Sequence, residues 1–185
     1  MNRIKILFVL FIAFLYDNAN SQINKGYWMV GGYANFSNNT LVGPNNSLTD
    51  TYITINPTLG YFVNDKIALG AELFYLFSYS SAFTRNSASN YGIGPFVRYY
   101  FLNKEKALNI LIQGSGGYNL ATSSSDSRSD KSISYSLLGG PVIFFNSSVG
   151  IEFLLGYKGY SAPNVRKESF NVNIGIQVHL VKDHN

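Results

Sequence analysis

The stretch NYGIGPFVRYYF (residues 90–101) decides the fold, because its residues alternate in character from one position to the next. Apolar side chains occupy every second position from Tyr91 to Phe101, and the positions between Tyr91 and Tyr99 carry two glycines, Phe96 and the charged Arg98. Successive side chains of a β-strand point to opposite faces, so the pattern predicts a strand with one apolar face and one mixed face.

Runs of the same kind recur along the chain and predict an all-β protein. The eight runs lie near residues 26–36, 51–63, 67–79, 90–102, 107–120, 132–145, 148–160 and 168–180. Three of the connections between them are short, and they alternate with longer connections rich in Ser and Asn. The short connections are 64–66, 103–106 and 146–148, and the long ones are 37–50, 80–89, 121–131 and 161–167. This alternation is typical of an up-and-down barrel with turns at one end and long loops at the other.

Charged residues within the runs share one face with small and polar residues. Glu72, Arg98, Glu152 and Lys158 all fall on the mixed parity of their runs, opposite a nearly continuous apolar face. Only the run at 26–36 is ambiguous, because Trp28 and Met29 give its two faces similar character. Register is therefore specified for seven of the eight predicted strands.

The alternation is compatible with two orientations of the barrel, with the apolar face turned inward or outward. A soluble, lipocalin-like barrel would turn its apolar face inward, but its outer face would then need many more charges than the 13% that this chain contains. Small residues suit the crowded interior of an eight-stranded barrel, and the bulky apolar face suits hydrocarbon. Aromatic residues cluster near the run ends, as in proteins that cross a bilayer. Those at one level are Tyr61, Tyr99, Phe101 and Phe145, and those at the other are Tyr75, Phe77, Tyr79, Tyr91, Tyr118 and Tyr157. We therefore predict an eight-stranded antiparallel up-and-down transmembrane β-barrel.

The first residues have the pattern of a secretory signal. Arg3 and Lys5 precede an apolar stretch from Ile6 to Tyr16, and the small residues at 19–21 suit cleavage. This predicts a signal peptide at 1–21 and an exported barrel domain at 22–185, for which the periplasm, the medium and the outer membrane are the possible destinations; the apolar outer face favours the outer membrane. The net charge of +4 comes without a basic run, which argues against nucleic-acid binding, and the absence of cysteine excludes disulfides.

The charges on the mixed face predict a structural cluster inside the barrel. A buried charge without a partner costs several kcal/mol, so these side chains should meet one another. The predicted interior polar cluster is Glu72, Arg98, Gln113, Glu152, Lys158 and Gln177. We expect it to plug the lumen, and a small pore is the alternative.

Catalytic chemistry has little support in the sequence. The only histidines, His179 and His184, have no nucleophile or orienting partner near them in sequence, and His179 suits a lumen side chain better than a catalyst. No metal-binding spacing, phosphate loop or cofactor motif is present, and a calcium site in 125–131 is weaker than a solvated loop. We predict no enzyme activity, no catalytic residues, no cofactor and no metal; a lipid-modifying barrel is the third possibility.

The stretches INPTLGYFVNDKIALGAEL (55–73), GPFVRYYF (94–101) and KGYWMVGGYANFS (25–37) resemble the small OmpA/OmpX-type, porin-like outer-membrane barrels of Gram-negative bacteria. The resemblance implies a monomer embedded in outer-membrane lipids, delivered by periplasmic chaperones and inserted by the barrel assembly machinery. The chain differs from such barrels in continuing past Leu180 instead of finishing on an aromatic residue. Pro57, Pro95 and Pro141 lie within runs, where we expect bulges or strand ends. The resulting hypothesis is a structural or surface-interaction barrel.

Overall fold

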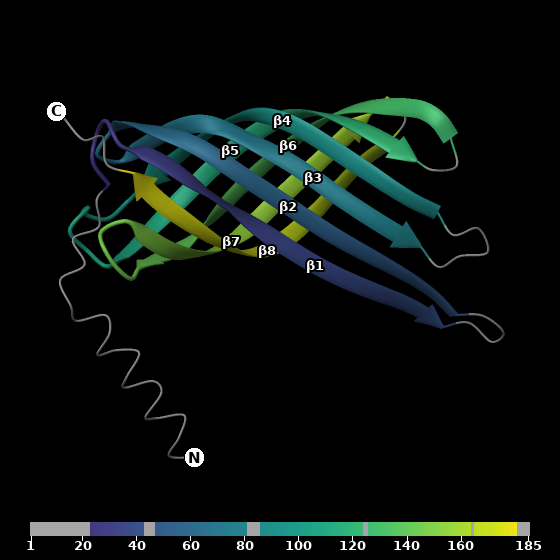
Figure 1. Cartoon of the computed structure of the whole chain (residues 1–185), viewed down its shortest axis with the longest axis horizontal. Coiled ribbons are helices and arrows are strands. Elements are labelled where there is room, and N and C mark those ends of the chain that lie inside the picture. Colours follow the sequence, from purple (N-terminus) through teal and green to yellow (C-terminus); the bar gives the residue numbers. More distant parts are fainter. Residues whose placement is uncertain (1–22, 43–46, 81–85, 124–125, 164, 181–185) are drawn as a thin grey trace, which may run out of the picture.

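The chain forms a closed barrel of eight antiparallel strands, each paired with its neighbours in sequence, and β1 pairs with β8 to complete the ring (Figure 1). The structure is a computed structural model and describes residues 23–42, 47–80, 86–123, 126–163 and 165–180. The strands are β1 (Trp28–Val42), β2 (Ser47–Asn64), β3 (Ile67–Ser80), β4 (Asn86–Tyr100), β5 (Leu108–Ser123), β6 (Asp126–Phe144), β7 (Val149–Ala162) and β8 (Val165–Leu180). The predicted fold is confirmed; the predicted signal peptide lies outside the described residues.

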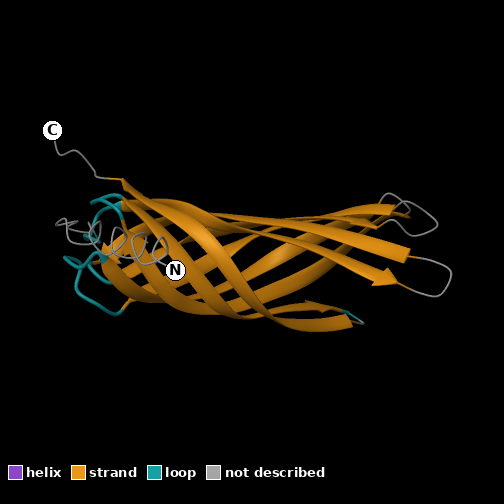
Figure 2. Ribbon diagram, turned by 90° about the horizontal axis from the view of Figure 1, so that it is seen from below, coloured by secondary structure: helices purple, strands orange, loops and turns teal. Residues whose placement is uncertain are grey.

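Three short connections join the strands at one end of the barrel, as predicted (Figure 2). In two of them an asparagine side chain accepts hydrogen bonds from backbone amides of the turn. In the β2–β3 turn the side-chain oxygen of Asn64 accepts hydrogen bonds from the amides of Lys66 and Ile67, both at 2.8 Å. In the β6–β7 turn Asn146 does the same for two following amides at 2.8 Å. Asparagine favours such turns because its side chain can replace a backbone acceptor.

The connections at the opposite end are much shorter than predicted. Residues 37–42 and 47–50, expected to be a loop, continue the β1–β2 hairpin, and the other three hairpins extend in the same way (Figure 1). Cross-strand pairs of polar residues support this extension; the Asn38 amide donates to Thr51 at 3.0 Å, and the hydroxyls of Thr40 and Thr49 lie 3.2 Å apart. The prediction was wrong because it ended each strand where the apolar alternation stops. Hydrogen bonding between strands needs no apolar face, so the strands continue through polar residues.

The faces of the strands follow the predicted parity. Exposed apolar side chains form a continuous outer band, in which Leu73, Ile93 and Ile174 are about half exposed. The ambiguous strand β1 turns Met29 and Tyr33 inward, where both are buried, and Trp28 outward. Among the described residues, no helix is both long enough and apolar enough to cross a membrane.

The three in-strand prolines cause neither a bulge nor a strand end, contrary to the prediction. Each proline is paired on one side, and on the other side the ladder skips it and the residue before it and then resumes in the same register. The paired residues are Gly32 for Pro57, Ala71 for Pro95 and Ile110 for Pro141, and the skipped residues are 56–57, 94–95 and 140–141. Proline lacks one donor and so disturbs one ladder only. The register shifts lie elsewhere, at Phe62/Asn64 and Thr122/Ser123.

The seam between the first and last strands is short. It contains seven paired positions, from Trp28 opposite Leu180 to Ala34 opposite Ile174, whereas β1 and β2 pair continuously from Trp28 to Val42. Beyond Ala34 one side-chain hydrogen bond, from Asn35 to the carbonyl of Val172 at 3.3 Å, links the two strands. The barrel is therefore most open along this line, toward the end with the extended hairpins.

Candidate functional site: the barrel interior

The barrel interior has three layers, and the first is an apolar layer at the short-turn end. Side chains from the strands and from the segment that precedes β1 pack there without exposure to solvent. They include Ile23, Met29, Phe62, Ala68, Leu111, Leu138, Val142, Phe144 and Leu154. His179 lies among them, with its ring 5.0 Å from that of Phe62 and 5.3 Å from that of Phe144. The interior at this end is filled by side chains.

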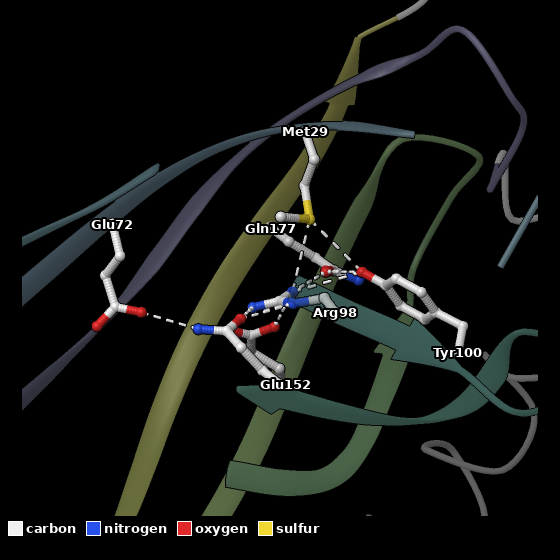
Figure 3. A network of polar contacts seen from close by, with 7 residues as sticks. Met29, Glu72, Arg98, Tyr100, Glu152 and Gln177 are labelled. Atoms are coloured by element: carbon white, nitrogen blue, oxygen red, sulfur yellow. Dashed lines mark hydrogen bonds and ion pairs between the residues drawn. The ribbon is translucent and has the colours of Figure 1, made fainter. Parts of the chain in front are cut away.

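The second layer is centred on Arg98, which is almost completely buried (Figure 3). Its Nη1 donates to Glu152 Oε2 at 2.8 Å and to Gln177 Oε1 at 2.7 Å. Its Nε and Nη2 both donate to Gln113 Oε1, at 2.8 and 2.6 Å. Tyr100 Oη also donates to Gln177 Oε1 at 2.7 Å. The guanidinium thus holds together residues from β4, β5, β7 and β8.

Glu72 joins this network through Gln113 and not by direct contact with Arg98. Gln113 Nε2 donates to Glu72 Oε2 at 2.8 Å, so the glutamine bridges the cation and the carboxylate (Figure 3). The other carboxylate oxygen accepts from Tyr33 Oη at 2.8 Å and from Asn56 Nδ2 at 3.0 Å. Both oxygens of the buried Glu72 carboxylate therefore accept hydrogen bonds from neutral donors, which offsets the cost of burying its charge.

The structure brings five of the six predicted cluster residues into one hydrogen-bonded network: Glu72, Arg98, Gln113, Glu152 and Gln177. Lys158 lies apart, with its ammonium 4.2 Å from the centre of the Tyr33 ring and no carboxylate within ion-pair distance among the described residues. Sequence reasoning missed Tyr33, Asn56 and Tyr100. The alternation of side chains along a strand places Asn56 and Tyr100 on the mixed face. Their inward direction could therefore have been predicted, although their hydrogen-bond partners could not.

The third layer is a cavity of about 330 Å³ between the ionic layer and the extended hairpins. The cavity exists because inward-facing residues of β4, β5 and β6 are small, namely Gly94, Ser115, Gly117, Ser134 and Ser136. Glu72 and Lys158 are at its wall, together with amide side chains and the aromatic residues Phe74 and Tyr160. Two wall residues, Asn56 and Asn119, are at most 2% exposed and yet keep polar atoms without hydrogen-bond partners.

Comparisons with known proteins identify the fold. No family model and no curated protein match the sequence. The crystal structure of Neisserial surface protein A (NspA) superposes with a TM-score of 0.59 at 17% identity, covering 83% of this chain and 97% of that one. The N-terminal β-barrel domain of Pseudomonas aeruginosa OprF gives a TM-score of 0.52 at 10% identity, covering 84% of this chain and 98% of that one. These matches bear out the predicted resemblance at the level of the fold.

Proposed function

We propose that the protein is an integral outer-membrane β-barrel with a structural or surface-interaction role. The observation that carries this proposal is the direction of the side chains: apolar residues such as Leu73 and Ile174 face outward, while Arg98 and Glu152 face inward. A soluble monomer rarely exposes an apolar patch of more than a few hundred Å². In a bilayer the same band is in its preferred solvent, and closure of the barrel satisfies the backbone groups.

Exposed aromatic residues support the same placement. Trp28, Tyr61 and Phe101 lie on the outer surface near the short turns, and Tyr91 and Tyr157 lie nearer the other end. Aliphatic residues fill the band between these two levels. Tyrosine and tryptophan favour bilayer interfaces, because their rings are apolar and their polar groups reach water. We propose outer-membrane lipids as the surrounding medium, and the barrel assembly machinery and periplasmic chaperones as partners during biogenesis of a monomer that does not bind nucleic acid.

The proposed lumen is plugged and does not conduct. The apolar layer around Phe62 and Phe144 and the ionic layer around Arg98 lie in series along the axis, and both consist of buried side chains. An eight-stranded barrel leaves room for little beyond such side chains. The extended hairpins at the other end offer the surface for partners. Because the cavity is open on that side, the pore remains the second candidate and calls for its own measurement.

Cell fractionation combined with a heating test on gels examines the membrane proposal. The chain is expected in the outer-membrane fraction, and its band should shift in mobility only after boiling, because a closed barrel resists detergent at room temperature. Recovery of the chain from the soluble fraction without detergent, with Leu73 and Ile174 protected from solvent-borne labels, would falsify the proposal.

Liposome swelling separates the plugged barrel from the pore. Vesicles that contain the wild-type chain should swell no faster in small solutes than empty vesicles. The Arg98→Ala variant, which removes the centre of the ionic layer, tests whether the plug closes the lumen; the Lys66→Ala variant at the β2–β3 turn is the control. Solute-dependent swelling by the wild type favours the pore. A change in lipid composition on deletion of the gene would instead favour the third possibility, a lipid-modifying enzyme.

A further inference from the structure

The cavity above the ionic layer has the features of a binding site. Its volume of about 330 Å³ falls within the ~300–1,000 Å³ of small-molecule sites. It lies inside the barrel, between the Glu72 network and the extended hairpins, and its wall includes Asn35 and Asn173, just beyond the last paired positions of the short β1–β8 seam. A small molecule could therefore reach it from the hairpin end without passing the filled layers.

Two residues in the wall of this cavity, Asn56 and Asn119, carry polar atoms without hydrogen-bond partners among the described residues. Asn119 is 1% exposed, and among the described residues neither its Oδ1 nor its Nδ2 has a hydrogen-bond partner. Asn56 uses its Nδ2 on Glu72, but its Oδ1 is without a partner. Buried amide groups left unpaired cost about 1–3 kcal/mol each, so a ligand that both donates and accepts hydrogen bonds would recover this energy.

Glycine at position 92 makes room for one of these amides. A Cβ atom at Gly92 would lie 2.0 Å from Asn119 Oδ1, so a larger residue on β4 would displace the asparagine side chain. Ser134 and Ser136 on β6, the strand paired with that of Asn119, keep the adjoining part of the wall small. The cavity wall thus combines unpaired amides with small residues, whereas larger side chains fill the other two layers.

The charges and aromatic residues of the wall favour a hydroxyl-rich ligand over an anion or an apolar molecule. Lys158, Lys167 and Glu72 line the cavity. The charge of Glu72 balances that of Lys158, and the remaining cation, Lys167, is exposed to solvent, so the wall offers an anion no buried cation without a balancing carboxylate. An apolar molecule would leave the amides of Asn56 and Asn119 unpaired. Phe74 and Tyr160 offer apolar surface beside the amides, which suits the C–H face of a sugar ring.

We propose that this cavity binds a saccharide of one or two units, with Asn119 and Asn56 hydrogen-bonding its hydroxyl groups. A hydroxyl both donates and accepts, which matches the unpaired Nδ2 and Oδ1 atoms. The sugar reaches the cavity either free or as the terminal unit of a longer chain. The inference depends on the barrel interior alone and goes beyond the proposed membrane role.

Titration calorimetry on the full chain folded in detergent tests the proposal. The probes are a panel of neutral mono- and disaccharides, oligosaccharides that end in the same units, and sulfate and phosphate as anions without the hydroxyl pattern. At least one saccharide should bind saturably. A free monosaccharide that binds as well as the oligosaccharide indicates a free ligand, and tighter binding of the oligosaccharide indicates a chain terminus.

The matched variants are two asparagines of β5. Asn119→Ala should weaken saccharide binding by about threefold to tenfold or more, because it removes hydrogen bonds to the ligand. Asn109→Ala, at the sealed end, should leave affinity unchanged, because that side chain is engaged with the backbone of Leu102 and Ile110. Ser134→Phe should fill the cavity and abolish binding, and the gel mobility shift reports whether each variant folds.

Three results would overturn the proposal. The first is that no saccharide of the panel binds at millimolar concentration. The second is that binding is the same in Asn119→Ala and in folded Ser134→Phe, which places the sugar on the outer surface. The third is that only sulfate or phosphate binds, and that Lys158→Met removes it, which makes the cavity an anion site. None of these results would alter fractionation or the heating shift, so failure here is distinguishable from failure of the membrane proposal.

Discussion

Replacement of Arg98 by leucine should destabilise the barrel far more than the loss of one ordinary contact. Arg98→Leu leaves Glu152, which is 0% exposed, without its cation, and it removes both donors from Gln113 Oε1. Breaking a buried ion pair by removing one partner costs about 3–5 kcal/mol, because the remaining charge is uncompensated. Glu152→Leu should cost a similar amount, since it leaves the guanidinium with neutral partners.

The double variant Arg98→Leu/Glu152→Leu should recover much of this loss. Apolar pairs of similar volume often replace buried ion pairs at little net cost. The double variant should therefore lose about 3 kcal/mol less than the sum of the two single variants, a coupling far above the ~0.5 kcal/mol expected for independent sites. The remaining deficit comes from Gln113 Oε1, which loses two donors, and from Gln177 Oε1, which loses one.

Urea unfolding of the four proteins in lipid vesicles measures the cycle, with fluorescence of Trp28 as the probe. Trp28 is the only tryptophan of the chain and is 45% exposed on the outer face of β1, so it reports when the barrel leaves the lipid. Arg166→Leu is the control, because Arg166 and Glu168 form an ion pair that is exposed to solvent. The reasoning is refuted if the two interior substitutions are additive, or if each changes the free energy of unfolding as little as Arg166→Leu.

Three further perturbations follow from the structure. Gly94→Ala should prevent or slow folding, because a Cβ atom there would lie 1.7 Å from a backbone carbonyl oxygen, whereas Gly114→Ala, with its nearest contact at 3.9 Å, should fold normally; equal gel shifts would contradict this. Ile174→Arg should lower the unfolding free energy in vesicles by roughly 2–4 kcal/mol if the band crosses the bilayer, and an unchanged value would exclude that placement. The hydrogen bond from the backbone amide of Lys25 lowers the pKa of Asp65 below its ordinary 3.8. This contact therefore stabilises the folded chain above pH 3.8, and the stabilisation is lost as the pH falls through the lowered pKa. Protection of the Lys25 amide from hydrogen exchange should fall with acid in the wild type and should not depend on acid in Asp65→Asn.

The sequence was sufficient to predict the fold and the faces of seven strands. The apolar parity around Leu73 and Ile174 is a local signal that needs no knowledge of partners. The face of β1 was undecided, because Met29 and Tyr33 are large residues on the parity that turns inward. Tyr33 is held there by Glu72, 39 positions away in sequence, and such a pairing depends on the stagger between strands, which alternation does not reveal.

The candidate site was predicted in part. Charges on one parity indicated where Arg98 and Glu152 would point, but not that Gln113 would bridge Arg98 and Glu72. Lys158 shares the interior without joining the network, because its strand position carries it into the cavity layer. The cavity itself had no sequence signal: small residues on several strands create it only when the register brings residues such as Ser115 and Ser136 to the same level.

The short seam between β1 and β8 has a consequence for the kinetics of folding. Hairpins can form from neighbours along the chain, but the seven pairs of the seam join Trp28–Ala34 to Ile174–Leu180, the two most distant parts of the described chain. Ring closure must bear the largest loss of chain entropy for the fewest contacts, so it should come last and be the slowest step. A disulfide between cysteines engineered at Val30 and Val178 should therefore slow unfolding more than a disulfide engineered across any other pair of neighbouring strands.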